Sequence, residues 1–327
     1  METVKTRDTY WDVIKGVLIV LVVIGHIMQL NETDQLAETT VNLIYSFHMP
    51  LFVMVSGYFS NPDSRSFKNG ILRLFETYIV LQLLKSSIEG TLNAHELLTP
   101  RFALWYLLSL VYWKIMLIFM NGNIQAHKNL FFGGMLILCF MFGALPLTVE
   151  LSFQRTFAFM PFFVFGYLLR GVDYNTIIQK IPMPLAIVVF ITFVLISYFV
   201  NRSLILDFSG MLSFHSGIKS FLISRLLILS IGSIMSMCVM RLTFNLRDCK
   251  FLCLLGQATL HIYIYHIFFF QFLKYLKVNS LISTEYVALL LYSLAIVVGL
   301  YFSSKIKIFN LILNPFTNLY NIWKTRS

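Results

Sequence analysis

Three polar residues interrupt the apolar stretch Tyr10–Gln29, which reads YWDVIKGVLIVLVVIGHIMQ. At about 100° of rotation per helical residue, Lys15 and His26 return to nearly the same face, and Asp12 lies within about 60° of both. Lys15 and His26 are separated by roughly 16 Å along the axis. Such a stripe must face protein or water, because ionisable groups in hydrocarbon are costly. An imidazole exchanges protons near neutral pH, so His26 is a candidate general base.

A second histidine lies in the next apolar stretch, SFHMPLFVMVSGYF. By helical rise, His48 and His26 both lie roughly 6–10 Å below the same membrane boundary. Sequential helices joined by a short loop are usually neighbours, so the two imidazoles are predicted to face one cavity. The alternative, that each histidine only hydrogen-bonds a neighbouring helix, stays open.

Aromatic and basic residues open two later apolar stretches. Trp105 and Tyr106 begin one of them, and Arg155 begins another. These residues suit either an interfacial belt or a surface that binds a sugar.

Five further polar residues are expected to connect helices. Gln257 and His261 share a helical face in GQATLHIYIYHIFF, whereas His266 does not, and hydrogen bonds between helices are expected there. Glu76 and Lys114 lie at similar depth on consecutive antiparallel stretches, which predicts an ion pair.

The elements that position these residues are membrane helices. The chain has 327 residues, of which 58% are hydrophobic and only 12% charged, whereas soluble domains carry about 25% charged residues. The net charge of +10 reflects topology rather than nucleic-acid binding, because the basic residues fall mostly in alternate loops. The four cysteines show no paired zinc-ligand spacing, so no metal site is predicted.

The apolar windows predict an all-α polytopic bundle of about ten spans that forms a single domain over residues 1–327. The predicted spans are 12–30, 41–60, 71–88, 104–120, 130–147, 155–170, 183–200, 219–240, 254–273 and 286–303. An even number of spans puts both termini on one side, and the excess of Lys and Arg there makes that side cytoplasmic. Lys15 then lies at the cytoplasmic end of its helix, with His26 toward the outside. A C-terminal amphipathic segment, Lys305–Trp323, is expected on the membrane surface.

Seven motifs follow one another along nearly the whole chain: Lys15-Gly16, VVIGH, FHMPLFVMVSGYF, SFKNGILRLFETYIV, LWYLLSL, RTFAFMPFFVFGYLL and HIYIYHIFFF. In this order they resemble the acyltransferase-3 family of bacterial membrane proteins, in particular its branch of fucose 4-O-acetylases and surface-polysaccharide O-acyltransferases. Lys15 stands where the family has a characteristic arginine, so the charge is kept and the bidentate fork is lost. The glutamate of the family's fourth-span motif is absent from LWYLLSLVYW, and its role is not carried over.

The resemblance implies transfer of an acyl group, usually acetyl, from cytoplasmic acyl-CoA to a hydroxyl group of a glycan or lipid-linked sugar. Acetyl-CoA is then a co-substrate, and no cofactor is permanently bound. Direct transfer and an acyl-histidine relay both remain open. The expected roles are catalysis by His26 and His48, binding of CoA phosphates by Lys15, Lys68 and Arg73, and contact with the acceptor by Asp12, Trp105, Tyr106 and Arg155.

The expected location is the bacterial cytoplasmic membrane, with membrane lipids, acyl-CoA and the glycan as partners. Two other classes remain as alternatives. One is a polysaccharide or lipid exporter, for which transporter-like repeats are expected and none is visible in the sequence. The other is a non-catalytic membrane protein of glycan assembly, in which the polar stripe serves packing alone.

Overall fold

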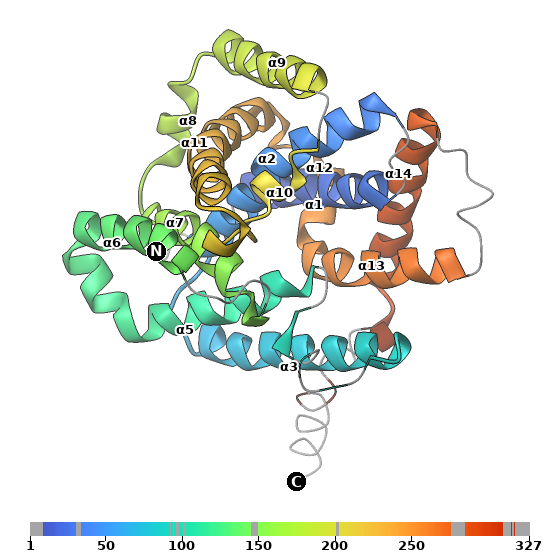
Figure 1. Ribbon diagram of the computed structural model, residues 1–327, viewed down its shortest axis with the longest axis horizontal. Coiled ribbons are helices and arrows are strands. Elements are labelled where there is room, and N and C mark those ends of the chain that lie inside the picture. Colours follow the sequence, from blue (N-terminus) through green and yellow to red (C-terminus); the bar gives the residue numbers. More distant parts are fainter. Residues whose placement is uncertain are drawn as a thin grey trace, which may run out of the picture. The chain divides into compact units, whose positions relative to one another are not determined.

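The protein is all-helical over the part of the chain that its computed structural model describes (Figure 1). The described residues are 9–30, 34–91, 93, 95, 98–100, 103–144, 150–200, 203–275, 285–309, 315 and 317. The chain divides into two compact units that alternate along the sequence. The first unit comprises Met1–Phe52, Gly171–Ile205 and Ser230–Ser303, and the second comprises Val53–Arg170, Leu206–Leu229 and Ser304–Ser327. The prediction of a single domain stays a prediction.

Three of the five boundaries between the units fall inside helices, namely α2 (Gln35–Tyr58), α10 (Ile205–Phe208) and α11 (Ile218–Thr243). The other elements of the first unit are α1 (Thr9–Leu30), α8 (Tyr174–Gln179), α9 (Met183–Val200), the 3-10 helix η4 (Phe244–Leu246), α12 (Lys250–Gln257), α13 (Thr259–Tyr275) and α14 (Tyr286–Ser303). The other elements of the second unit are α3 (Arg65–Ile88), α5 (Leu104–Ala126), α6 (Lys128–Met141), η1 (Phe142–Ala144), η2 (Glu150–Ser152), α7 (Phe153–Leu168) and η3 (Phe214–Ser216).

Helix α1 is the central element of the first unit, where it packs against α12, α13 and α14 (Figure 1). Its aromatic start is buried, with Tyr10 2% and Trp11 1% exposed. The Tyr10 hydroxyl donates a hydrogen bond of 2.7 Å to the Met240 carbonyl, and its ring stacks on Tyr174 at 5.7 Å. The helix is therefore fixed at this end by contacts far apart in sequence.

Two glycines bring the backbones of α1 and α12 into direct contact. A Cβ atom on Gly16 would lie 2.1 Å from the Leu252 carbonyl oxygen, and one on Gly256 would lie 1.8 Å from the Asp12 carbonyl oxygen. Only glycine permits this distance, because a backbone carbonyl cannot rotate away as a side chain can. The crossing fixes the Asp12 turn of α1 against α12.

The predicted span 254–273 is broken. Helices α12 and α13 meet at Ala258 with a bend of 65°. The Thr259 hydroxyl donates a 2.7 Å hydrogen bond to the Gly256 carbonyl, and Ala258 N donates to Leu255 O at 3.0 Å. The carbonyls exposed by the break are thus satisfied locally, which a break in an apolar environment requires.

The second unit is built around α5, which packs against α3, α6 and α7. Trp113 is 1% exposed and stacks on Phe163 of α7 at 5.3 Å. The last turns of α2 cross α7 closely, since a Cβ on Gly166 would lie 1.9 Å from Met54 O and one on Gly57 would lie 2.0 Å from Phe163 O. Close crossings between small residues are typical of membrane helices.

At least one helix overlaps each of the ten predicted spans. By length and apolar composition, however, six helices in the described chain are able to cross a membrane. The bent pair α12–α13 raises this number to seven. Among the rest, α6 has 14 residues, α7 has 16, and α3 carries several charged side chains. The protein is therefore an all-α, multi-pass membrane protein, while ten spans and cytoplasmic termini stay predictions. Most of the segment Lys305–Trp323 lies outside the described residues.

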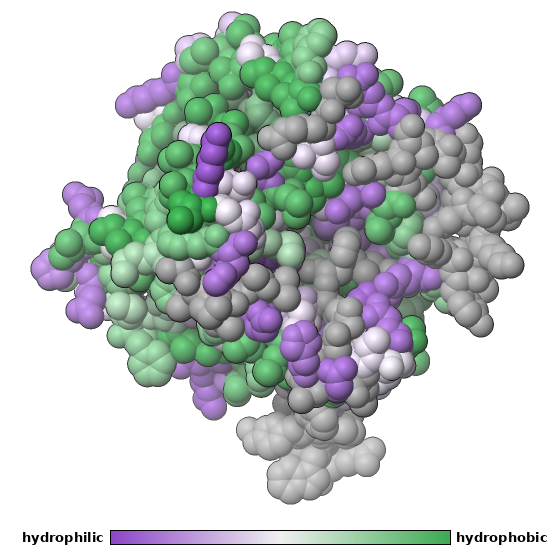
Figure 2. Space-filling view, viewed as in Figure 1, coloured by the Kyte–Doolittle hydropathy of each residue, from purple (hydrophilic) through white to green (hydrophobic). Residues whose placement is uncertain are grey.

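Helix α9 shows the surface expected of a helix in contact with lipid. Only Ala186, Phe193 and Ser197 are buried, and side chains such as Phe199 are exposed, in that case by 76%. Figure 2 shows mainly hydrophobic side chains over the position of α9. A helix that is apolar on its exposed face does not remain in water, so this face supports membrane burial.

The predicted ion pair between Glu76 and Lys114 is wrong. Lys114 Nζ lies 4.1 Å from the centre of the Phe67 ring, and the Glu76 carboxylate accepts hydrogen bonds from the backbone and hydroxyl of Thr317. Similar depth placed the two charges at one level, but depth does not determine which helical face each residue occupies.

Candidate active site

Three imidazoles and a phenol gather within the first unit. We call His26, Tyr45, His48 and His266 the histidine cluster; they come from α1, α2 and α13. The centre of the His26 ring lies 6.5 Å from that of His48, 5.4 Å from His266 and 5.9 Å from Tyr45. The Tyr45 and His48 rings are 4.8 Å apart. His26 and His48 therefore lie near each other, as their equal predicted depth suggests.

Hydrogen bonds orient each ring of the histidine cluster. His48 Nδ1 lies 2.8 Å from the Ile44 carbonyl and His266 Nδ1 lies 2.7 Å from the Tyr263 carbonyl. A carbonyl only accepts, so in both rings Nδ1 carries the hydrogen and Nε2 has the lone pair. His266 Nε2 is buried and has no hydrogen-bond partner among the described residues. An acceptor left in this state suits a hydrogen-bond donor brought by a substrate.

The sequence did not reveal the contribution of α13 to this cluster. His261, the histidine that shares a face with Gln257 in the sequence pattern, lies 2.9 Å from the Ser303 hydroxyl of α14, so its predicted hydrogen bond between helices is confirmed. The hydrogen bond between helices expected for His266 is wrong, because His266 Nδ1 bonds the Tyr263 carbonyl of its own helix. Its ring stacks on that of His26 with an angle of 16°. The one available signal was that His261 and His266 occupy different faces of a helix.

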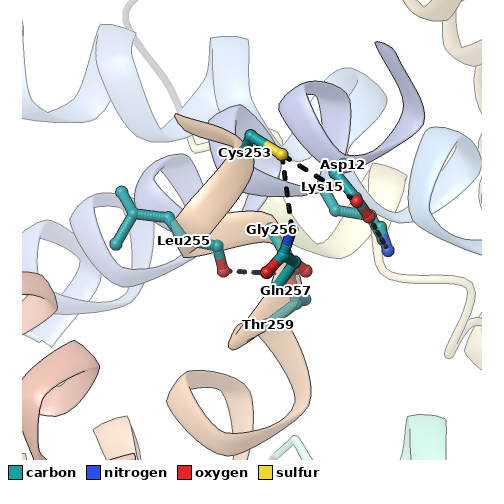
Figure 3. Close-up of polar contacts among 7 residues, drawn as sticks. All are labelled: Asp12, Lys15, Cys253, Leu255, Gly256, Gln257 and Thr259. Carbon is teal, nitrogen blue, oxygen red and sulfur yellow. Dashed lines mark hydrogen bonds and ion pairs between the residues drawn. The ribbon is translucent and has the colours of Figure 1, made fainter. Parts of the chain in front are cut away.

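Asp12 and Lys15 form an ion pair at the glycine crossing (Figure 3). Lys15 Nζ lies 2.7 Å from Asp12 Oδ1, and the Asp12 side chain is 3% exposed while that of Lys15 is 22% exposed. Cys253 Sγ lies 3.9 Å from Asp12 Oδ2, and Gln257 Nε2 donates to Cys253 Sγ at 3.5 Å. Asp12 thus acts as the counter-ion of Lys15, and its contact with an acceptor stays a prediction.

Removing the lysine charge should destabilise the protein more than removing both charges. Lys15→Met leaves the buried Asp12 without this ion pair, which costs on the order of 3 kcal/mol of unfolding free energy. The double variant Asp12→Asn with Lys15→Met should recover most of the loss, because no uncompensated charge remains. The thermal unfolding midpoint in detergent measures both effects. Additive losses in the double variant would show that the pair is not energetically coupled.

The candidate acceptor-binding residues lie in the second unit. The Arg155 guanidinium lies over the Trp105 ring at 5.0 Å, and Trp105 also packs on Phe159 at 5.5 Å. The Tyr106 hydroxyl lies 2.5 Å from the Ser56 hydroxyl. Trp105 is only 8% exposed and Tyr106 only 7%. Both rings therefore pack between helices in this structure, and their predicted contact with a sugar stays a prediction.

Lys68 and Arg73, the other candidates for binding CoA phosphates, also belong to the second unit. Both side chains are exposed on α3 and lie roughly one and a half helical turns apart. The structure does not bring them onto one face of this helix. Their role toward the donor stays a prediction.

A cluster of imidazoles among the helices of a multi-pass membrane protein is a candidate site for proton transfer. Comparison with known proteins shows the family of the chain. The acyltransferase-3 family, described as "Acyltransferase domain", matches residues 8–303, and the chain belongs to this family. The match includes residues of both compact units. The protein is therefore a multi-pass membrane member of the acyltransferase-3 family.

Two similar proteins come from rhizobia. The nodulation protein NolL of Sinorhizobium fredii is 46% identical over 61 residues, which cover 17% of each chain. The nodulation protein NolL of Mesorhizobium japonicum is 41% identical over 73 residues, which cover 20% of each chain. The chain thus spans a fifth or less of the length of these relatives. No solved structure matches the chain.

Proposed function

We propose that the protein transfers an acetyl group from cytoplasmic acetyl-CoA to a hydroxyl group of a cell-surface polysaccharide or its lipid-linked precursor. The observation that carries this proposal is the position of His26, which hydrogen-bonds Tyr45 and stacks on His266 among membrane helices. A sugar hydroxyl has a pKa far above 7, so its attack on a thioester needs a base at the reacting atoms. Both relatives come from bacteria, which supports the proposed location of the protein in a bacterial cytoplasmic membrane.

The direct route has a simple proton balance. His26 takes the proton from the acceptor hydroxyl while the hydroxyl oxygen forms a bond to the carbonyl carbon of the thioester. The carbon–sulfur bond then breaks, and the departing CoA thiolate receives the proton from the His26 imidazolium. In the alternative route, His26 itself receives the acetyl group before the acceptor does. His48 completes the proposed catalytic pair, with its ring 6.5 Å from that of His26.

Lys15 is proposed to bind a phosphate of CoA at the cytoplasmic end of α1, with Lys68 and Arg73 as further contacts. The partial exposure of Lys15 supports this role, because its side chain is 22% exposed while it pairs with Asp12. An ammonium bound to a phosphate forms a charge-assisted hydrogen bond. Asp12, Trp105, Tyr106 and Arg155 are retained as proposed acceptor contacts.

The neutral double variant Asp12→Asn with Lys15→Met tests donor binding, because it removes the lysine charge without the stability loss expected when Asp12 is left unpaired. Its KM for acetyl-CoA should rise by about tenfold to a hundredfold, as expected for loss of a charged hydrogen bond to the donor. Measuring initial rates of CoA release over a range of acetyl-CoA concentrations gives this value. Lys15→Arg, which keeps both the charge and Asp12, is the matched control and should retain near-normal donor affinity. An unchanged KM in the neutral variant would remove Lys15 from the donor site.

Glycan analysis in cells tests the proposed function as a whole. The O-acetyl content of surface polysaccharide is compared between a strain that lacks the protein and its parent. The deletion strain is complemented with the wild-type chain or with His26→Ala at equal expression. Loss of O-acetyl groups, restored only by the wild-type chain, supports the proposal. Equal O-acetyl content in the deletion strain and its parent, with no transfer from radiolabelled acetyl-CoA in isolated membranes, would refute it.

A further inference from the structure

The hydrogen bonds of Tyr45 have a direction. Its hydroxyl lies 3.0 Å from His26 Nδ1 and donates to Gln29 Oε1. A tyrosine hydroxyl has one proton, so an oxygen that gives it to Gln29 can only accept from His26. The hydrogen between His26 and Tyr45 therefore belongs to Nδ1. In the neutral imidazole, the lone pair is then on Nε2.

The position of Gln29 suits this arrangement. His26 and Gln29 are three residues apart on α1, so they are neighbours on one helical face. Tyr45 of α2 contacts both of them and is 9% exposed. One phenol thus connects two side chains of the same helical turn through a continuous pair of hydrogen bonds.

Stacking on His266 does not determine which edge of the His26 ring faces Tyr45. The His266 ring lies 5.4 Å from that of His26 at an angle of 16°, which restrains the plane of the His26 ring. A half-turn of His26 about its Cβ–Cγ bond keeps this plane and exchanges the two edges of the ring. The hydrogen bond to Tyr45 favours only one of the two orientations. Plane and orientation are thus restrained by different residues.

The other imidazole beside Tyr45 does not compete for this role through Nδ1. His48 lies 4.8 Å from the Tyr45 ring, but its Nδ1–H donates to the Ile44 carbonyl at 2.8 Å. His48 therefore does not donate its Nδ1–H to the Tyr45 hydroxyl.

We propose that Gln29 and Tyr45 are positioning residues that hold His26 in its Nδ1–H tautomer, so that Nε2 is the nitrogen that receives the acceptor's proton. This inference rests on the proposed function. The proton moves from the acceptor oxygen to Nε2, Nδ1 keeps its own, and the imidazolium later gives the Nε2 proton to the CoA thiolate. While His26 is charged, its hydrogen bond from Nδ1 to Tyr45 is charge-assisted and becomes stronger. The arrangement of nucleophile, base and orienting group is general in acyl transfer.

The hydrogen bonds from His26 through Tyr45 to Gln29 are called the hydrogen-bond relay, or the relay, below. Variants at two positions test this relay through kcat. Tyr45→Phe keeps the ring and removes the oxygen, and Gln29→Met removes the terminal acceptor at similar size. Each should lower kcat by about tenfold to a hundredfold, the effect of losing one hydrogen bond to a charged group, with little change in the KM for acetyl-CoA. In the double variant the losses should not add, because both residues act through one chain of hydrogen bonds. Gln29→Glu keeps an acceptor at the end of the chain and should retain most activity.

Tyr286→Phe is the matched control. It removes a hydroxyl that lies 3.1 Å from the Thr40 hydroxyl in the same unit and is not part of the histidine cluster, so it should leave kcat unchanged. If the wild type transfers acetyl and His26→Ala does not, yet Tyr45→Phe and Gln29→Met have normal kcat, the relay is refuted and the proposed function stands. Inactivity of Gln29→Glu equal to that of Gln29→Met would refute the assigned direction of the relay.

A spectroscopic measurement tests the tautomer without relying on activity. The protein is labelled with ¹⁵N-histidine in detergent, and the His26 signals are identified by their absence in His26→Gln. The relay requires a protonated Nδ1 and an unprotonated Nε2 in neutral His26, and a mixture of both tautomers in Tyr45→Phe. A wild-type protein with the proton on Nε2 would overturn the inference, even if acetyl transfer is confirmed. The expected tautomer in a protein that transfers no acetyl group would uphold the geometry and refute the proposed function.

Discussion

Replacing His26 with alanine should lower the rate of acetyl transfer at least about 100-fold, the usual scale for removal of a general base. The His26 imidazole contacts both Tyr45 and His266, by a hydrogen bond and by ring contacts. Transfer of radiolabel from acetyl-CoA in isolated membranes measures the rate, and immunoblotting of the same membranes gives the amount of protein.

His215→Ala is a suitable control for that measurement, because His215 is an exposed histidine of the second unit. The control should show normal transfer and normal abundance. His26→Ala should match it in abundance and differ only in rate. Near-normal transfer by His26→Ala would exclude both the base and the acyl-histidine route.

The second large effect is expected at the crossing of α1 and α12. Gly256→Ala places a Cβ 1.8 Å from the Asp12 carbonyl oxygen, so one of the two helices must shift. Overpacking of this kind costs about 1–3 kcal/mol or more of unfolding free energy. The thermal unfolding midpoint in detergent should fall clearly, and the fraction of monodisperse protein in size-exclusion chromatography should fall with it.

Gly299→Ala provides the matched comparison, since a Cβ at that position of α14 meets nothing within 4 Å. Alanine is the better helix former, so this control should be neutral or slightly stabilising. If Gly256→Ala unfolds at the same temperature as Gly299→Ala, the two backbones are not in contact in the folded protein.

The sequence predicted the helices better than their packing. The predicted spans 183–200 and 286–303 have the same bounds as α9 and α14, because each is an uninterrupted apolar stretch. The break between α12 and α13 was not predictable in this way. The apolar pattern continues through Ala258, whereas the bend accompanies a contact between Gly256 and α1 that is distant in sequence.

The same distinction applies to the candidate site. Asp12, Lys15 and His26 follow from the period of a single helix, and His48 follows from helical rise and a short loop. Tyr45 and His266 depend on which helical faces meet, so neither was found. The ion pair between Glu76 and Lys114 failed for the same reason, because two residues can lie at the same depth and face different neighbours.

The Asp12–Lys15 ion pair also bears on how the protein is made. Its partners lie three residues apart on α1, so the bond needs no other helix in order to form. A charged residue that enters the bilayer without a partner is costly. By pairing within one helical turn, the two residues enter the bilayer as a neutral unit. Helix α1 is synthesised long before α12, and during that interval it carries its own counter-ion.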